Sequence, residues 1–551
     1  MKKVTFKTPV GTPFPTIRKM MQDTMAVAAN DLAYRYKEGD GVAKVTYARF
    51  YSDVEALGAM LTAQGFGDAH IACVGENSYP WIVTYLTSLM SGGVYVPLDK
   101  ELPEEELCGL LLRSESTILF YSAHYEEMLK RNRERLSSIK IFVGFGRESD
   151  DGDFRSFRKW IEAGRSMDKT AYDAWHRDPD EMKMLVFTSG TTGVAKGVML
   201  TETNLVSGVH YGLAVSTLKG CGLSVLPYNH TYEAVCDILV QIRCANNLFI
   251  NDNLKNVVAN MQLAHPDFMC VVPAFSDLFY KNIIRNIERQ NKTRAFNKLI
   301  AVSEFLRHKL HIDLRRVFFK QIHKTFGGNL RRIVCGGAPI RPEVGMFFDK
   351  IGILMTGGYG ITECSPLVSV NTEHIDENTF TTVGYRLPCL EWRIDNPNEE
   401  GIGEICVRGA VVMKGYYHAP EKTAEVLKDG WFYTGDYGKL TSDDRLIITG
   451  RKKNIIILAN GKNIYPEEIE NYISNVPYIA EVVVRGIKDE YGQEEGLEAE
   501  VYLSEPHDEK EVLKDIRASL SILPSYKNIA RVKIRDTEFE KTTTRKIRRT
   551  A

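Results

Sequence analysis

The chain has 551 residues, too many for one ordinary hydrophobic core, and this length suggests roughly three to four structural units. Its composition is that of a soluble globular protein, with 44% hydrophobic and 26% charged residues, 43 Gly and 20 Pro. The formal net charge of −1 gives no global electrostatic reason to expect nucleic acid or an anionic membrane as a partner.

Targeting signals and cysteine usage both favour a cytosolic protein. The start, "MKKVTFKTPVGTPFP", has lysines but no apolar core, so we expect no signal peptide. The most apolar stretch, residues 81–98, is interrupted by Ser91, Gly92 and Gly93 and is too polar for a membrane span. The ten cysteines form no CxxC pair and lie in apolar contexts, which predicts reduced core residues and no zinc site.

The first half alternates helical and strand patterns. Residues 47–65 form an amphipathic pattern that ends at a glycine, and residues 81–93 read as a buried helix. Residues 69–75 and 94–99 have strand patterns, and further strand patterns follow at residues 223–230, 268–275 and 330–340. This alternation implies crossover units and a mainly parallel sheet that is covered on both faces.

Residues 276–326 are different, because they are long, helical and basic. We interpret them as a solvated helical pair that covers the sheet. A surface that faces a partner or a lipid is the alternative.

The predicted secondary structure becomes mainly β-strand from about Trp392 onward, with strands expected at 391–396, 403–412 and 445–450. "GRKKN", residues 450–454, follows, and we place a domain boundary at Gly450–Lys453. Beyond it we expect a compact α+β unit. Its strands are predicted at 455–460, 481–487, 497–503 and 530–536, and its helices at 466–474, with Pro466 at the start, and 508–523.

The stretch "FTSGTTGVAKG", Phe187–Gly197, has three glycines, four hydroxyl side chains and one lysine. Such a loop can hold phosphates through backbone N–H groups, hydroxyls and the Lys196 charge. It is not the common P-loop, because Gly197 follows the lysine and the first helix start comes only at Thr201, an N-cap candidate. We expect the loop to join two strands, and a solvated flexible hairpin is the alternative.

Two glycine-rich segments could hold a nucleotide. In "GGYGITECSP", residues 357–366, Tyr359 could stack on a base and Glu363 could support Mg²⁺. A glycine turn with a surface glutamate is the alternative. "CGGAPI", residues 335–340, ends a strand with two glycines, where ligands of open parallel sheets are found.

Three single residues complete the set of candidates. In "WFYTGDYG", Asp436 lies in a glycine turn and could accept both hydroxyls of a ribose, although for this residue alone an Asx turn is the favoured explanation. His230 follows a strand end, where a lone histidine is more often structural than catalytic. Lys546 lies in the basic C-terminal tail and has a role only if that tail moves over the phosphate site.

Taken together and in this order, the motifs resemble those of the adenylate-forming (ANL) superfamily of AMP-dependent synthetases and ligases. "TSGTTGVAKG" looks like the phosphate loop of that family, and "YGITE", "YTGD", "GRKKN" and "TTRKIRR" look like its later motifs. The resemblance covers nearly the whole chain. "LPYNHTYE", "VPAFSDLFYKNI", the helical stretch and "LRRIVCGGAPI" look most like long-chain fatty-acid–CoA ligases.

The resemblance implies two half-reactions. A carboxylate attacks the α-phosphate of ATP and gives acyl-AMP and pyrophosphate, after which the thiol of CoA takes the acyl group and releases AMP. ATP, Mg²⁺ and CoA are therefore implied. The loop at 187–197 would anchor the departing pyrophosphate rather than a transferred γ-phosphoryl group.

The resemblance also implies roles for individual residues. Thr188 and Glu363 would bind Mg²⁺, Thr362 would contact the α-phosphate, and His230 would lie between the carboxylate site and the acyl tunnel. Lys546 would bridge the carboxylate and the α-phosphate for in-line attack. The residues implied to bind ATP are Thr188, Ser189, Gly190, Thr191, Thr192, Gly193, Lys196, Gly336, Gly337, Ala338, Gly358, Tyr359, Gly360, Thr362, Asp436 and Arg451.

The fold implied is α/β. A large domain, residues 1–450, has parallel or mixed sheets with helices and a β-rich subdomain. Residues 451–453 form a hinge centred on Lys453, and residues 454–551 form a small mobile α+β domain. Three residues depart from the family pattern: Arg545 stands where glycine is frequent, Asn454 where an acidic residue is common, and Ala274 where long-chain members usually have arginine.

Several alternatives stay open. The acyl group could pass to the phosphopantetheine of an acyl carrier protein, or the substrate could be a small aryl or amino carboxylate. An amino-acid activator needs a carboxylate for the α-ammonium, and Glu233 or Asp237 is the nearby candidate. A non-catalytic binding module is a further alternative. We expect a cytoplasmic location and no nucleic-acid partner, and peripheral association with the inner face of a membrane is left open, as are chain length and oligomeric state.

Overall fold

The structure, a computed structural model, describes residues 13–188, 195–376, 378–458, 462–488, 494–541 and 547–549. The chain divides into two units. The first comprises residues up to 380 together with 384–390 and 409–427, and the second comprises 381–383, 391–408 and 428 onward. The predicted hinge at 451–453 concerns motion and stays a prediction.

The first unit has two large mixed sheets. The strands that the structure describes in the nine-stranded sheet are, in spatial order, β16 (Tyr385–Arg386), β15 (Leu367–Val370), β14 (Leu354–Gly360), β13 (Arg332–Cys335), β12 (Phe268–Val271), β10 (Cys221–Ser224), β11 (Asn247–Ile250), β1 (Leu32–Glu38) and β2 (Gly41–Thr46). Those of the eight-stranded sheet are β19 (Gly415–Tyr416), β9 (Lys196–Thr201), β8 (Met182–Thr188), β4 (Val94–Leu98), β3 (His70–Val74), β5 (Ile118–Tyr121), β6 (Ile141–Gly144) and β7 (Phe154–Ser156).

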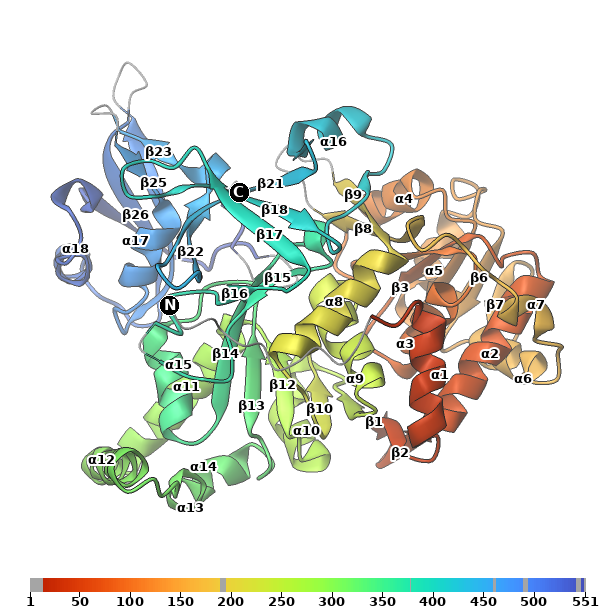
Figure 1. Cartoon of the computed structure of the whole chain (residues 1–551), viewed down its shortest axis with the longest axis horizontal. Coiled ribbons are helices and arrows are strands. Elements are labelled where there is room, and N and C mark those ends of the chain that lie inside the picture. The colour runs from red at the N-terminus through yellow and green to blue at the C-terminus, as the bar shows by residue number, and fades with distance from the viewer. Residues whose placement is uncertain are drawn as a thin grey trace. The chain divides into compact units, whose positions relative to one another are not determined.

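Helices surround both sheets (Figure 1). They are α1 (Ile17–Ala28), α2 (Tyr47–Ala63), α3 (Tyr79–Leu89), α4 (Glu104–Arg113), α5 (Glu126–Arg131), α6 (Phe157–Gly164), α7 (Thr170–Asp173), α8 (Glu202–Val215), a π-helix (Tyr232–Leu239), α9 (Val240–Arg243), α10 (Val257–Ala264), α11 (Pro273–Arg289), α12 (Thr293–Lys309), α13 (Arg315–Phe318), α14 (Lys320–Thr325), α15 (Pro342–Lys350) and α16 (Pro420–Val426). Short 3₁₀ turns lie at Ala123–Tyr125, Leu254–Asn256 and Thr362–Cys364.

Helix α8 lies between the two sheets, in contact with β8 and β9 of one and β15 of the other (Figure 1). It begins with a capping box in which the Thr201 hydroxyl accepts from Asn204 N–H at 3.1 Å and the Asn204 side chain accepts from Thr201 N–H at 2.9 Å. The predicted N-cap is confirmed. The position of this helix fixes β8 and β9 relative to the strands of the nine-stranded sheet.

Continuous apolar runs explain the central parallel strands, because both faces of these strands are covered. All residues of β4 and β5 are buried, and so is most of β3. No disulfide joins the ten cysteines, all of which lie in the described ranges. Six of them are buried, including Cys73 and Cys335, and the other four are half-buried, so the prediction of core positions holds for six.

The second unit contains β-strands and a small α+β part. Its strands are β17 (Leu390–Asp395), β18 (Gly403–Gly409), β20 (Leu427–Lys428), β21 (Trp431–Leu440), β22 (Leu446–Arg451), β23 (Ile456–Ile457), β24 (Asn463–Ile464), β25 (Ile479–Lys488), β26 (Glu494–Leu503) and β27 (Arg531–Arg535). Its helices are α17 (Pro466–Ile473) and α18 (Glu509–Ser519), with 3₁₀ turns at Lys452–Asn454 and Ser525–Lys527. The α/β class and the β-rich C-terminal region are as the sequence predicts.

A close helix crossing in the first unit gives a stability prediction. A Cβ atom at Gly164, at the end of α6, would stand 2.0 Å from the carbonyl oxygen of Ala56 in α2, whereas one at Gly109 in α4 would meet nothing within 4 Å. Gly164→Ala should destabilise the protein by about 1–3 kcal/mol through overpacking. The matched control Gly109→Ala should be neutral or stabilising by up to about 1 kcal/mol. Urea unfolding of both variants checks this, and equal stability would contradict the close approach.

Candidate active site

The carboxyl ends of four neighbouring strands define one edge of the nine-stranded sheet. β10, β12, β13 and β14 run parallel, with Val271 opposite Cys335 and Cys335 opposite Gly357. Parallel strands end at the same edge, where open α/β sheets hold their ligands. The segments that follow β10, β13 and β14 contain His230, Gly336–Ala338 and Thr362–Glu363, so the structure brings these predicted groups to one edge.

Glycines allow the backbone to approach closely at this edge. Gly337 has φ +87°, which disfavours any residue with a side chain. A Cβ at Gly360 would lie 2.6 Å from the carbonyl oxygen of Pro366. Because β14 continues through Gly360, the alternative of a glycine turn is wrong here, and Tyr359 is a buried strand residue, 7% exposed.

The predicted phosphate loop connects two antiparallel strands, as expected. Thr188 ends β8, Lys196 begins β9, and the two residues are partners in the sheet register. Ser189, Gly190, Thr191, Thr192 and Gly193 lie outside the described residues. The structure therefore gives the two flanks of this loop, each with a side chain of the predicted site.

A tyrosine that sequence analysis missed links the loop to Glu363. Tyr416 lies on β19, which pairs with β9, and the Lys196 ammonium nitrogen stands 4.8 Å from the centre of its ring. The Tyr416 hydroxyl donates to Glu363 Oε1 at 3.0 Å. The Met413 N–H also donates to the backbone carbonyl of Glu363 at 2.8 Å. Only the sheet register identifies Tyr416, since "KGYYHAP" gives no chemical signal in sequence.

Glu363 has the properties of a Mg²⁺ ligand. It is half-buried, and no ion pair to it is found in the described part of the chain. The described residues hold no cluster of three His, Cys, Asp or Glu side chains that would bind a metal by themselves. Mg²⁺ typically takes one or two carboxylates and completes its shell with water and substrate phosphates, so a donor set of Glu363 with the Thr188 hydroxyl fits this ion.

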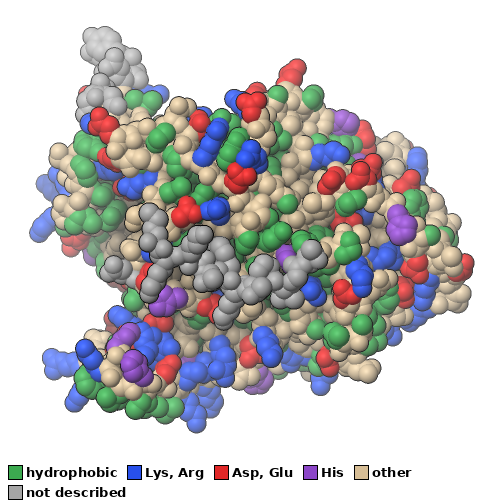
Figure 2. All heavy atoms as spheres, viewed as in Figure 1, with side chains coloured by type: hydrophobic (Ala, Val, Ile, Leu, Met, Phe, Trp, Pro, Cys, Tyr) green, Lys and Arg blue, Asp and Glu red, His purple; other side chains and the backbone are tan. Residues whose placement is uncertain are grey.

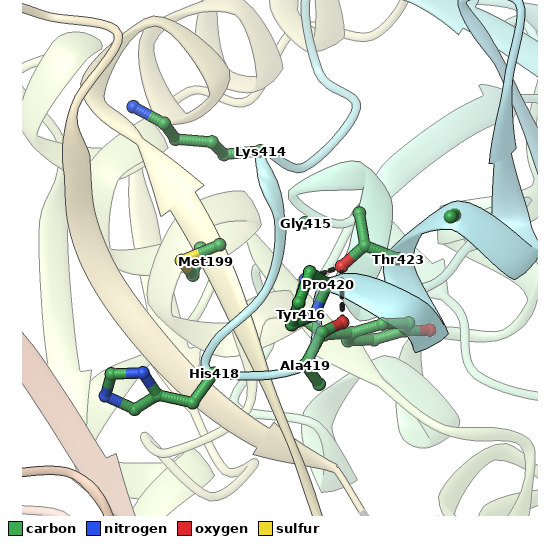
Figure 3. Close-up of a pocket in the computed structure, with 9 residues that line it drawn as sticks. Met199, Lys414, Gly415, Tyr416, His418, Ala419, Pro420 and Thr423 are labelled. Carbon is green, nitrogen blue, oxygen red and sulfur yellow. Dashed lines mark hydrogen bonds between the residues drawn. The ribbon is translucent and has the colours of Figure 1, made fainter.

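A shallow hollow of about 420 Å³ borders Tyr416 (Figure 3). It lies among β9, β19 and α16, and Met199, Tyr416 and Thr423 are part of its lining. Thr423 accepts from the Tyr416 N–H at 2.9 Å and donates to the Ala419 carbonyl at 2.9 Å. The hollow contains none of the residues predicted to bind ATP. Its relevance is that α16 holds the backbone of Tyr416 in place.

In the second unit, Asp436 and Arg451 are direct neighbours. They are partners in the β21–β22 register, and Arg451 Nε donates to Asp436 Oδ1 at 2.7 Å. Asp436 is 3% exposed and lies within β21, so the expectation of a glycine turn at this position is wrong, although Gly435 does have φ +70°. Lys453 follows in a 3₁₀ turn and is exposed.

The C-terminal segment is anchored, not a free tail. Lys541 and Ile547 form an isolated antiparallel bridge, and the Arg549 guanidinium is ion-paired with Glu470, whose other oxygen accepts from Val484 N–H at 2.6 Å. Burial raises the pKa of Glu470 to about 7, against the opposing effect of Arg549. Lys546 lies outside the described residues, but the residue bonded to it, Ile547, is held on this unit.

Comparisons with known proteins agree with this geometry. The profile of the AMP-binding enzyme family matches residues 21–417. The chain belongs to this family.

The relatives in this family include a Mycobacterium bovis protein named long-chain-fatty-acid–CoA ligase FadD15, 31% identical over 474 residues, which are 81% of this chain and 76% of the relative. The Rattus norvegicus protein named long-chain-fatty-acid–CoA ligase 5 is 28% identical over 86% of this chain and 73% of its own. Among solved structures, an anthranilate CoA ligase, AuaEII, in complex with anthranoyl-AMP, has the same fold, with a TM-score of 0.77, 17% identity, and 98% and 96% of the two chains covered. None of the helices in the described ranges combines the length and the hydropathy needed to span a membrane.

His230 precedes an unusual element at the same carboxyl edge of the nine-stranded sheet. Its backbone carbonyl accepts from Ala234 N–H at the entrance to the π-helix Tyr232–Leu239, and its side chain is half-buried. A π-helix is rare and is frequently found at functional sites. Nothing in the sequence pattern predicts it. The Tyr232 hydroxyl donates to the carbonyl of Val334 on β13 at 3.0 Å, and this hydrogen bond ties the π-helix to that strand.

Two carboxyl groups lie fully buried on this π-helix. Glu233 accepts from the Ser224 hydroxyl at 2.5 Å and Asp237 accepts from the Gln241 amide at 2.8 Å. Their remaining oxygens have no N–H or O–H donor among the described residues, and the two carboxyl groups interact directly. One proton on Glu233, directed at Asp237, would give both of these oxygens a partner. The pair is 0% and 1% exposed, so neither carboxylate is available to an amino-acid substrate.

Because these two carboxyl groups are buried, their ionisation makes the folding stability of the protein depend on pH. Burial raises the pKa of Asp237 to about 6 and that of Glu233 well above its usual range. The unfolded Asp has a pKa near 3.9. Both states are protonated at low pH, so the folded protein is favoured below about pH 4 and loses stability as the pH rises through about 6.

Asp237→Asn should remove the part of this dependence that comes from Asp237, because an amide accepts from Gln241 and donates to Glu233 without ionising. The part that comes from the burial of Glu233 should stay. Relative to wild type, the variant should gain on the order of 3 kcal/mol between about pH 4 and pH 7. Urea unfolding at several pH values measures the difference. The surface variant Asp180→Asn is the control, and parallel profiles for wild type and Asp237→Asn would rule out a buried proton-sharing pair.

Proposed function

We propose that this protein activates a fatty acid with ATP to an acyl-AMP and then forms its CoA thioester, with release of AMP and pyrophosphate. The observation that carries this proposal is the 31% identity, across 81% of the chain, to a protein named long-chain-fatty-acid–CoA ligase. In the first step a carboxylate oxygen bonds to the α-phosphorus and the bond to pyrophosphate breaks. In the second step the CoA sulfur bonds to the acyl carbon and AMP leaves.

The first unit supplies charge for the first step. Two anions must meet, so cations and donors directed at the phosphates lower the barrier. We assign Lys196, the Thr188 hydroxyl and residues 189–193 to the β- and γ-phosphates, and Thr362 to the α-phosphate. Mg²⁺, held by Glu363 and Thr188, would neutralise developing charge on the phosphate oxygens. Gly336–Ala338 and Tyr359 would bind adenine.

The second unit supplies the remaining roles. The Asp436 carboxylate, oriented by its ion pair with Arg451, would accept the ribose hydroxyls. Lys546 would place the substrate carboxylate against the α-phosphate. We propose that the C-terminal domain, residues 454–551, turns about Lys453 between the two steps. One arrangement of the site cannot easily hold both Lys546 for the first step and the channel for the CoA thiol in the second.

Two alternatives concern the substrates. Transfer to a carrier-protein phosphopantetheine would use the same first step. Activation of a small aryl or amino carboxylate would need a different acyl pocket. An amino-acid substrate would need a carboxylate for its α-ammonium group, and Glu233 and Asp237 are the carboxylates nearest to His230 along the chain. Both are buried, which disfavours an amino acid as the substrate. We place the reaction in the cytoplasm, where the ten free thiols stay reduced, with the enzyme peripheral to the inner face of the membrane.

A carboxylate panel from acetate to oleate, with benzoate and amino acids, tests the proposed function. With ATP and Mg²⁺, a medium- or long-chain fatty acid should give AMP and pyrophosphate over many turnovers only when CoA is present. Pyrophosphate release that stops after about one turnover despite CoA would indicate a carrier-protein acceptor. ADP in place of AMP would overturn the assignment.

Tyr416 should position Glu363 for the first step. Tyr416→Phe keeps the ring beside Lys196 but removes the hydroxyl that donates to Glu363. A hydrogen bond to a charged group contributes about 1.5–3 kcal/mol, so adenylation should slow by about tenfold or more and need more Mg²⁺ for half-maximal rate.

The adjacent Tyr417 provides the matched control for this variant. Its hydroxyl donates to the exposed Glu115 at 2.7 Å, so Tyr417→Phe should leave both the rate and the Mg²⁺ requirement unchanged. Pyrophosphate release against Mg²⁺ concentration measures both variants. An unchanged Mg²⁺ requirement in Tyr416→Phe would show that the hydroxyl does not position Glu363.

A further inference from the structure

Helix α12, Thr293–Lys309, has two very different faces. The inner face packs on the core of the first unit through Phe296, Leu299 and Ile300, and Ser303 on this face is 1% exposed. The outer face consists of Arg294, Lys298, Val302, Phe305 and Lys309, which follow one another at helical spacing and are all exposed. Phe305 is 58% exposed, so a large aromatic side chain stands in water among cations.

The corner after α12 continues this outer face. Leu310 and Ile312 in the connection to α13 are 53% and 47% exposed, and Val317 on α13 is 67% exposed. Lys320 is exposed beside them. Exposed apolar residues that occur singly need no explanation, but here four of them, counting Phe305, follow within thirteen residues along the chain.

Charge is concentrated on this part of the chain. Residues 273–325 contain twelve Lys or Arg and four Asp or Glu, a surplus of eight positive charges, while the whole chain has a net charge of −1. The remainder therefore carries a net charge of −9. Figure 2 shows Lys and Arg side chains gathered over α12–α14, at the lower left, with hydrophobic side chains among them.

The inner and outer cations of this region differ in their contacts. Arg307 and Arg315 donate to Asp349 at 2.8 and 3.0 Å and stabilise the packing of α12 and α13. Arg294, Lys298 and Lys309 make no hydrogen bond or ion pair through their side chains with any residue in the described ranges. The outer cations are therefore available to an external anion.

A polar hollow of about 450 Å³ lies beside the same corner. Its lining includes the cations Arg307, Arg315 and Arg331, as well as His308. It also includes the carboxylates of Asp349, which accepts from Arg307 and Arg315, and of Glu373, which accepts from Arg332. The hollow lies at the amino ends of β13 and β14, the opposite end of these strands from the nucleotide edge, since Arg331 precedes β13 and Leu354 begins β14. The Arg331 guanidinium has no hydrogen-bond acceptor among the described residues, which suits a lipid phosphate.

We propose that the outer face of α12 and the α12–α13 corner dock this enzyme on an anionic membrane. The cations contact headgroup phosphates, and Phe305, Leu310, Ile312 and Val317 enter the interface. This proposal rests on the proposed function in one respect: a long-chain fatty acid, the proposed substrate, is concentrated in a bilayer. An acidic protein partner would use the cations but gives less reason for the exposed apolar corner.

Sedimentation of the full chain with lipid vesicles tests the proposal. Wild type should bind vesicles of phosphatidylcholine mixed with phosphatidylglycerol, and should bind pure phosphatidylcholine vesicles far more weakly. Raised salt should weaken the binding. A triple variant, Arg294→Glu, Lys298→Glu and Lys309→Glu, should lose roughly 100-fold or more in affinity, since each cation near an anionic surface contributes roughly fivefold. Phe305→Ser should lose affinity but keep the salt dependence.

A second triple variant, Lys140→Glu, Lys159→Glu and Lys255→Glu, makes the same charge change at exposed positions elsewhere on the first unit and should bind as wild type does. Turnover of a soluble medium-chain carboxylate without vesicles should be equal in all these proteins. The turnover assay therefore tests the proposed function, and the vesicle assay tests the docking surface independently of it. Absence of wild-type binding, or equal losses in the two triple variants, would overturn the proposal.

Discussion

The parallel register of β12, β13 and β14 determines where the other groups of the first unit can stand. Since Cys335 is opposite both Val271 and Gly357, β12 and β13 end at one level of the sheet, while β14 continues past it to Gly360. Backbone crowds this edge, and a side chain at Gly360 would collide with Pro366. The glycines here follow from strand pairing, and the space they leave open is what a flat base and a phosphate chain require.

The second requirement is that opposite charges stay close without neutralising each other. Lys196 and Glu363 carry opposite charges, and an ion pair between them would leave neither available to a phosphate or a cation. Tyr416 contacts both, with its ring beside the ammonium and its hydroxyl on the carboxylate. A tyrosine can do this because its ring face attracts cations while its hydroxyl donates to anions. The capped helix α8 keeps the strands that carry these groups in fixed register.

The sequence predicts what depends on local pattern and fails where long-range register decides. The strand-to-strand loop, the Thr201 cap and the buried cysteines are confirmed because each is written in adjacent residues. Tyr416 and the π-helix at Tyr232 could not be foreseen, since they depend on pairing between segments far apart in the chain. Asp436 was expected in a turn because Gly435 precedes it, but β21 continues through both residues, and Gly435 lies at an irregularity in the pairing of β21 with β18. The roles assigned to Thr188, Glu363 and Lys546 stay predictions.

The anchoring of the C-terminal segment constrains how Lys546 could act. A lysine on a free tail could reach a phosphate by motion of the tail alone. Here Lys541 is bridged to Ile547, and Arg549 is held by a buried carboxylate and by the Val484 carbonyl at 3.4 Å. Ile547, which follows Lys546 in the chain, is therefore held to this unit by its bridge to Lys541. Bringing the lysine to a substrate and withdrawing it again would then require movement of the whole C-terminal domain, which is the motion that a hinge at Lys453 would permit.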